Sequence, residues 1–184
     1  LWLALEEFEE LFEEKSTYTR VLEEKRLRES KNITIIPYEE KYQKKFEELN
    51  KNWINEYFTM EKKDTLSLEN PQEYILDKGG YILVALYKNE IVGVCALLKS
   101  DNENYDYEMA KMAVDENFQG KGIGIILAKN IIHKAKELNA KTIFLESNTI
   151  LKPAITLYKK LGFKKIDGYS SPYVRSNISM ELIL

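Results

Sequence analysis

The stretch that decides the fold is MAVDENFQGKGIGIIL (Met112–Leu127), in which three of the chain's eight glycines fall within five residues. It joins a run typical of a strand, residues 107–114, to a run typical of a helix, residues 122–138. Such a junction exposes backbone N–H groups at the positive end of a helix dipole, and glycine lets an anion approach them closely. The sequence therefore predicts a phosphate-binding loop at this junction.

Two familiar phosphate loops do not match this pattern. A P-loop needs Ser or Thr after its Gly-Lys pair, but Gly122 follows Lys121 here. A dinucleotide fingerprint has the spacing G-x-G-x-x-G near the start of a βαβ unit, whereas Gly120, Gly122 and Gly124 follow a predicted antiparallel hairpin. The alternative to a ligand loop is a tight turn with close helix packing.

The remaining patterns predict a mixed sheet with helices on its faces. Strands are expected over residues 33–37, 81–87, 91–99, 107–114, 141–147, 163–167 and 176–184. Helices are expected over residues 39–58, 122–138 and 153–161, with a short helical turn after Pro71. The fold class is therefore α/β of the α+β type, with a sheet of six or seven strands flanked by helices.

Composition limits the class of protein. The 184 residues are 44% hydrophobic, which is enough for a core and suits one domain with an appendage. The sequence has no apolar run of membrane-spanning length and no secretory leader, so we expect a cytoplasmic protein. The single cysteine, Cys95, excludes an internal disulfide, and with only one histidine in the chain we expect no metal site.

The first thirty residues have a different texture from the rest. They contain no Gly or Pro and predict one long helix with an apolar stripe at Leu1, Leu5, Phe8 and Phe12. A single helix cannot bury that stripe, so we expect a partner, which a homodimer could supply. The acidic excess of the chain lies in residues 1–32, and the rest is neutral with no basic stripe for nucleic acid. We divide the chain into an extension, residues 1–30, and a domain, residues 31–184.

Two motifs then carry a resemblance to a known family. The run Gln119-Gly120-Lys121-Gly122-Ile123-Gly124 resembles the Q/R-x-x-G-x-G/A signature of the GNAT superfamily of N-acetyltransferases. The segment AITLYKKLGF (residues 154–163) resembles the helix and following strand of the same family. The resemblance covers about residues 33–184 and implies a GNAT-like, mostly antiparallel mixed sheet.

The resemblance also implies a cosubstrate, acetyl-coenzyme A. Its pyrophosphate would be held by backbone N–H groups of the glycine loop, and its pantetheine arm would bond the backbone at the end of the preceding strand. Asn148 is a further candidate, because the place where the family often carries asparagine is Leu151 here. The implied cofactor-binding residues are Met112, Ala113, Val114, Gln119, Gly120, Lys121, Gly122, Ile123, Gly124 and Asn148.

Two residues are implied as catalytic. Tyr158 falls at the family's tyrosine position, where it resembles the general acid that serves the coenzyme A sulfur; the alternative is an aromatic core residue. Some branches carry a base glutamate at the position of Glu108, and burial would raise its pKa; the alternative is a surface carboxylate. Strand alternation predicts that residues 108, 110, 112 and 114 share one face.

Two residues are candidates for binding the acceptor. Arg175 is the one arginine after Arg28, and arginine suits a planar carboxylate; the alternative is a structural ion pair. Tyr57 lies in the helical region that lines the acceptor site of many relatives, where Trp53 is a better candidate for the core.

The first thirty residues bear on function too. The segment STYTRVLEEKRLRE, followed by ITIIPY, resembles proteins that fuse a MarR-type regulator to a C-terminal acetyltransferase. No recognition helix or wing is present, so we expect no binding of DNA by this fragment and no membrane partner. The favoured function is N-acetylation of a primary amine of a small molecule, such as an amino acid, by direct attack. The alternatives are a non-catalytic acyl-coenzyme A sensor and a protein-modifying acetyltransferase.

Overall fold

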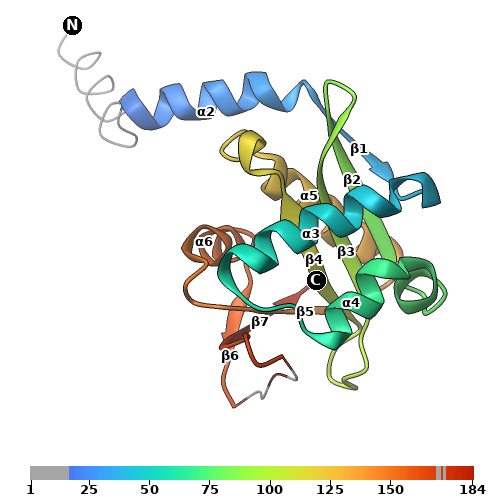
Figure 1. The fold of residues 1–184 in the computed structure, drawn as a ribbon. Helices are drawn as coiled ribbons and strands as arrows, with labels where there is room; N and C mark the ends of the chain where they lie inside the picture. Colours follow the sequence, from blue (N-terminus) through green and yellow to red (C-terminus); the bar gives the residue numbers. More distant parts are fainter. Residues whose placement is uncertain (1–16, 169–170, 172) are drawn as a thin grey trace, which may run out of the picture.

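The computed structural model of the chain describes residues 17–168, 171 and 173–184. Seven strands in this part of the chain form one sheet in the order β1-β2-β3-β4-β5-β7-β6 (Figure 1). The strands are β1 (Ile33–Pro37), β2 (Tyr81–Tyr87), β3 (Glu90–Lys99), β4 (Tyr107–Val114), β5 (Thr142–Ser147), β6 (Lys164–Ile166) and β7 (Ile178–Ile183). The mixed, mostly antiparallel sheet predicted from the sequence is confirmed.

The pairing of β4 with β5 sets up the opening in the sheet. These two strands run parallel and pair only at their first residues, Tyr107 with Ile143 and Glu108 with Phe144. All the other neighbouring strands described here pair antiparallel, and β5 pairs with β7 over its whole length. Beyond Glu108, β4 and β5 therefore diverge, and no strand within the described residues lies beside that edge of β4.

A β-bulge lies within the diverging part of β4. The register against β3 shifts by one residue between Val94, which faces Ala113, and Ala96, which faces Ala110. Lys111 sits in the bulge with a left-handed backbone, φ 50°, which few residues other than glycine adopt. An extra residue reverses the alternation of side chains along the strand. Odd-numbered residues before the bulge and even-numbered residues after it therefore point to the same face of the sheet.

The helices cover the two faces of the sheet (Figure 1). One core contains the buried face of α5 (Ile123–Glu137) together with Tyr107 and Met109 of β4, and Met112 and Val114 pack against it. The other core contains α3 (Gln43–Tyr57), α4 (Lys62–Glu69) and Ala113. Residues 112 and 114 therefore lie on the α5 face, whereas 108 and 110 precede the bulge and lie on the α3 face. The prediction that these four residues share one face is wrong, because the bulge intervenes.

Most predicted helices are confirmed, with two differences. The predicted helix over residues 39–58 begins as a 3-10 turn, Glu40–Tyr42, and continues as α3, while α6 spans Lys152–Lys160. Helix α4 was not predicted; it precedes the short π-helical turn Gln72–Leu76. Its N-terminus carries a capping box in which Glu61 and Asp64 each bond the other's backbone.

The described part of the N-terminal extension is helix α2 (Thr17–Ser30), which extends away from the sheet in Figure 1. Near its end, Glu29 accepts a hydrogen bond from the hydroxyl of Tyr87, at the end of β2. The helix predicted over residues 1–30 is confirmed for this part, whereas the stripe of Leu1, Leu5, Phe8 and Phe12 lies outside the described residues.

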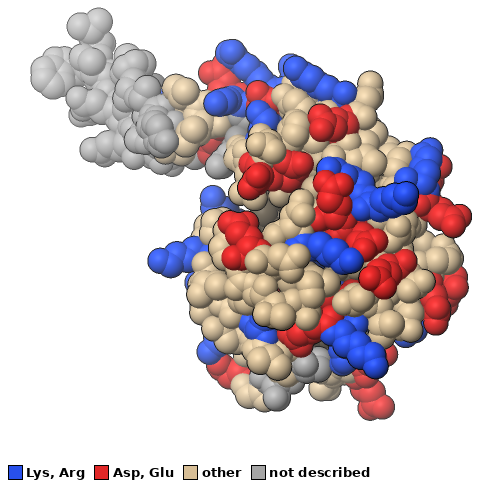
Figure 2. Space-filling model, viewed as in Figure 1, with Lys and Arg blue, Asp and Glu red and all other residues tan. Residues whose placement is uncertain are grey.

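The surface is mixed in charge. Over the described part of the face in view, Figure 2 shows basic and acidic side chains interspersed, without a large area of one sign. None of the described helices is long and apolar enough to cross a bilayer.

Asp106 joins β4 to β5 by hydrogen bonds at the closed end of the gap between these strands. Its carboxylate accepts hydrogen bonds from the backbone N–H groups of Lys141 and Thr142, at 2.7 and 3.1 Å, and from the Thr142 hydroxyl at 3.3 Å. The backbone N–H of Asp106 in turn donates to Thr142 Oγ1 at 3.0 Å. These bonds join the two strands where their pairing begins, and they lower the pKa of Asp106 below its ordinary value of 3.8.

We predict that Asp106→Ala lowers the free energy of unfolding at pH 7 by about 1 to 2 kcal/mol, because partly buried donors lose their acceptor. Asp106→Asn keeps the shape and removes the charge, so it isolates the contribution of ionisation. Because the folded-state pKa lies below 3.8, that contribution is full above pH 3.8 and is lost as the pH falls below it. Urea unfolding across pH should show the gap between wild type and Asp106→Asn closing in acid. A gap that widened in acid would contradict this assignment.

Candidate active site

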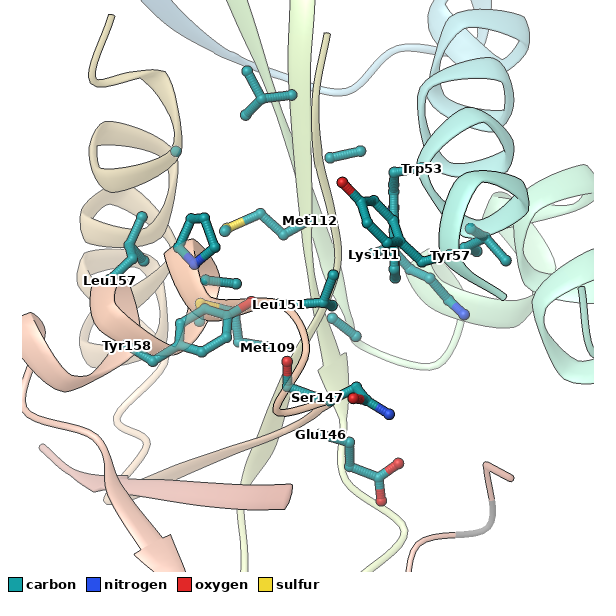
Figure 3. Close-up of a pocket in the computed structure, with 18 of the residues that line it drawn as sticks. Trp53, Tyr57, Met109, Lys111, Met112, Glu146, Ser147, Leu151, Leu157 and Tyr158 are labelled. Atoms are coloured by element: carbon teal, nitrogen blue, oxygen red, sulfur yellow. The ribbon is translucent and has the colours of Figure 1, made fainter. Parts of the chain in front are cut away.

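A cavity of about 770 Å³ occupies the gap between β4 and β5. Its walls come from α3, Asp64 of α4, β4 from Glu108 onward, the glycine loop with the start of α5, the end of β5, α6, and Tyr173, Arg175 and Ser176. Figure 3 shows Trp53 and Tyr57 on one side and Leu157 and Tyr158 on the other. The cavity is thus lined by both helical layers, with the open edge of β4 between them.

The glycine loop forms one end of this cavity. Gly120 and Gly122 have φ of 78° and 87°, and a Cβ at either position would meet no atom within 4 Å. The backbone therefore needs glycine for its conformation and leaves open space beside it. Gly122 is the N-cap of α5 and has no side chain with which to cap this end. The N–H groups of the first turn are therefore available where Ile123, Gly124 and Ile125 line the cavity.

Tyr158 projects from α6 into the cavity, with its hydroxyl toward β4 (Figure 3). The residue is 9% exposed, and its ring packs against the ring of Phe163 with 6.1 Å between the ring centroids. Burial raises the pKa of the Tyr158 phenol above its ordinary value of 10.0, and the nearby thiol of Cys95 acts in the same direction. The hydroxyl therefore remains protonated at neutral pH and can donate a proton or a hydrogen bond into the cavity.

Glu108 lines the cavity from the α3 face, where the two strands separate. Burial, followed by repulsion from the carboxylates of Glu146 and Asp101, raises the pKa of Glu108 from 4.5 to about 7. The ammonium groups of Lys111 and Lys63 oppose this rise. A carboxyl group with a pKa near neutrality can accept a proton at physiological pH, as a general base must.

A buried cluster of charges lies beside Glu108. Asp64 is fully buried and accepts hydrogen bonds from both terminal nitrogens of Arg175 and from Lys111 Nζ, the last at 2.7 Å. Burial acts to raise the pKa of Asp64, but these two cations outweigh it and hold the pKa below its ordinary value. Arg175 also donates to Glu61 at 3.0 Å and lies over the ring of Tyr173 at 4.6 Å. The cluster ties α4 to the segment before β7.

The structure brings together all but one of the residues predicted to form the site. Tyr57, Tyr158, Glu108, Arg175 and the predicted cofactor residues other than Lys121 line the cavity. Lys121 instead lies over the ring of Tyr87 at 5.5 Å. The amide of Asn148 donates to the backbone carbonyl of Arg175 at 2.6 Å and accepts from the backbone of Ile150, so its side chain is already engaged. The individual roles of these residues stay predictions.

The residues that line the cavity and were not predicted for the site include Asp64, Lys111, Glu146 and Tyr173. For Lys111 a signal was available, since it is a charged residue within the apolar run of β4. Asp64 had none, because its partners Lys111 and Arg175 are far away in the sequence.

Comparisons with known proteins agree with this geometry. The model of the acetyltransferase (GNAT) family matches residues 46–163. A human N-acetylaspartate synthetase is 30% identical over 111 residues, which is 60% of this chain but 36% of that protein. An uncharacterised N-acetyltransferase of Bacillus subtilis strain 168 is 35% identical over 104 residues, which is 55% of this chain and 66% of that protein. The chain thus spans about a third of the length of the synthetases it matches.

Solved structures show the same fold. A GNAT-family acetyltransferase from Staphylococcus aureus Mu50 has a TM-score of 0.72 and 25% identity, covering 81% of this chain and 97% of that one. A putative acetyltransferase from Salmonella typhimurium, solved with its cofactor acetyl-coenzyme A, has a TM-score of 0.64 and 18% identity, covering 83% and 94%. With the family match over most of the domain and the shared fold, this chain belongs to the GNAT family of acetyltransferases.

Proposed function

We propose that this chain transfers an acetyl group from acetyl-coenzyme A to the primary amine of a small molecule such as an amino acid, by direct attack. The observation that carries the proposal is the placement of Glu108 and Tyr158 around one cavity, at the point where β4 and β5 separate. The Glu108 carboxylate can accept a proton near neutral pH, because its pKa is raised, and the Tyr158 hydroxyl keeps its proton at that pH.

The proposed place for acetyl-coenzyme A is the α5 and α6 side of the cavity. The open positions beside Gly120 and Gly122, and the uncapped start of α5, fit a pyrophosphate. The unpaired edge of β4 at Met112, Ala113 and Val114 fits the amide groups of the pantetheine arm. The Salmonella typhimurium protein, which has the same fold and was solved with acetyl-coenzyme A, supports this choice of cosubstrate.

In the proposed reaction the neutral amine nitrogen attacks the thioester carbonyl carbon, forming a C–N bond while the C–S bond breaks. Glu108 takes the proton that the nitrogen loses, and Tyr158 supplies a proton to the departing sulfur. The products are an N-acetylated amine and coenzyme A with a free thiol. Glu108 then releases its proton to solvent and Tyr158 regains one, so protons and charge balance over the cycle. No further reactant is required.

We propose that the acceptor lies on the α3 side of the cavity, against Tyr57, with a carboxylate directed to the cluster around Arg175. The names of the matched synthetases, whose product is an acetylated amino acid, support an acceptor that carries a carboxylate. The resemblance of the N-terminal extension to a MarR-type fusion stays a separate hypothesis, as does dimerisation through that extension.

The test is release of coenzyme A thiol from acetyl-coenzyme A across a panel of amino acids and amines. We predict that Tyr158→Phe lowers kcat about 10²- to 10⁴-fold, because the sulfur loses its proton donor, while the ring still packs on Phe163. Unchanged thermal melting would show that the fold is intact. If acetyl-coenzyme A binds tightly but no amine raises thiol release above background, the non-catalytic sensor becomes the better interpretation.

We predict a distinct pH signature for Glu108→Gln. The wild-type rate relative to this variant should rise with pH up to about 7 and then level off, because only the deprotonated carboxylate accepts the amine proton. Taking the ratio of the two enzymes with one acceptor cancels the titration of the amine itself. A ratio that stays constant across the neutral range would rule out Glu108 as the base and favour a chain of water molecules.

A further inference from the structure

Lys111 occupies an unusual place in the sheet. It holds the left-handed position of the β4 bulge without being glycine, a conformation that is unfavourable for a residue with a side chain. The bulge directs its side chain toward α3, whereas its neighbours Met109 and Met112 point toward α6 (Figure 3). A strained backbone here places one ammonium group on the wall where the acceptor is proposed to bind.

The ammonium of Lys111 has spare hydrogen-bonding capacity. Its side chain is 6% exposed, and among the residues that the structure describes its one hydrogen-bond partner is Asp64 Oδ1 at 2.7 Å. A lysine ammonium has three donors, so two are left. The ring centroid of Tyr173 lies 5.5 Å from Nζ, which is a cation–π contact and uses none of the N–H donors in a hydrogen bond to oxygen. A buried cation with unused donors that lines a cavity favours an anionic oxygen from a ligand.

Asp64 and Arg175 are more fully engaged than Lys111. Asp64 accepts two bonds from Arg175, one from Lys111 and one from the backbone N–H of Glu61 at 3.3 Å. Arg175 divides its terminal nitrogens between Asp64 and Glu61. The carboxylate of Asp64 therefore holds both cations in place. Arg175 uses three of its five N–H donors in these bonds, whereas Lys111 uses one of its three.

The opposite sign of charge lies close by. Glu108 is three residues before Lys111 on the same face of β4, and Glu146 follows on the diverging end of β5. The acceptor side thus presents a cation cluster next to two carboxyl groups. An amino acid carries the matching pair of charges on adjacent groups, with its amine for Glu108 and its carboxylate for Lys111.

We propose that Lys111 determines acceptor specificity by binding the carboxylate of an amino-acid acceptor directly, so that decarboxylated amines bind poorly. This inference rests on the function proposed above and names a residue and a chemical group for the acceptor half of that site.

The test is calorimetric titration of the protein saturated with coenzyme A, a state in which no turnover occurs. The probes are matched pairs that differ only in the carboxylate: L-phenylalanine with 2-phenylethylamine, and L-leucine with 3-methylbutylamine. Wild type should bind at least one amino acid about ten- to a hundredfold more tightly than its amine, as a charge-assisted hydrogen bond would produce. Lys111→Gln, which can still donate to Asp64, should abolish this preference, so that the amino acid and its amine bind alike.

Two controls separate this role from the alternatives. Lys63→Gln removes an exposed lysine next to Asp64 and should keep the preference, since it lies outside the proposed contact. Lys111→Arg should keep part of it. Should Lys111→Gln unfold, Lys111→Asn provides a second neutral variant whose side chain tolerates the left-handed backbone. Equal binding of acid and amine by wild type, no binding of either, or a preference that survives both neutral variants would overturn the proposal.

Thiol release by wild type reports on the proposed function independently. Turnover of amines without a preference for the carboxylate would leave the acetyltransferase function standing and remove Lys111 from it. A carboxylate preference in the titration without any thiol release would contradict the acetyltransferase function. It would leave Lys111 in a binding site that performs no transfer.

Discussion

The short parallel pairing of β4 with β5 is the constraint on which the site depends. Two residue pairs hold the strands together at one end, where Asp106, just before β4, accepts bonds from the backbone at the start of β5. Beyond them β5 is kept away from β4 by its other neighbours, because β7 pairs along its whole length and the Ser147 carbonyl accepts bonds from Asn177 and Ser176. Unpaired backbone must be satisfied by something other than a strand. A cavity with an open strand edge is the result.

The bulge in β4 divides the chemistry between the two sides of that cavity. Because the extra residue reverses the alternation, Lys111 lies with Glu108 on the α3 side, while the next residue, Met112, lies on the side of α5 and α6. Buried Asp64 then anchors the basic side chains on the α3 side, from a helix far away in sequence. One inserted residue and one buried carboxylate thus determine which groups face each other.

The sequence was sufficient for features that depend on local pattern. The glycine loop, the strands and Tyr158 follow from periodicity, from turn chemistry and from a motif with fixed spacing, and the structure has these elements where they were expected. Helix α4 was not predicted, because KKDTLSLE lacks the apolar spacing of an amphipathic helix. Its N-cap is Glu61 rather than the usual Ser, Thr, Asp or Asn. The prediction that Glu108 and Met112 share a face was wrong, because a bulge cannot be recognised from the alternation of residue types in a strand. The ion cluster joins residues 64, 111 and 175, and such long-range pairing cannot be read from a single sequence.

A gap between two strands differs from a pocket with a floor, because it is lined by the helical layers on both faces of the sheet. In the proposed reaction the acetyl donor lies against α5 and α6, and the amine lies against α3 and α4. Neither molecule has to leave before the other enters, and no residue needs to carry the acetyl group between them. For the proposed reaction we therefore expect steady-state kinetics that follow a ternary-complex rate law, with intersecting rather than parallel reciprocal plots.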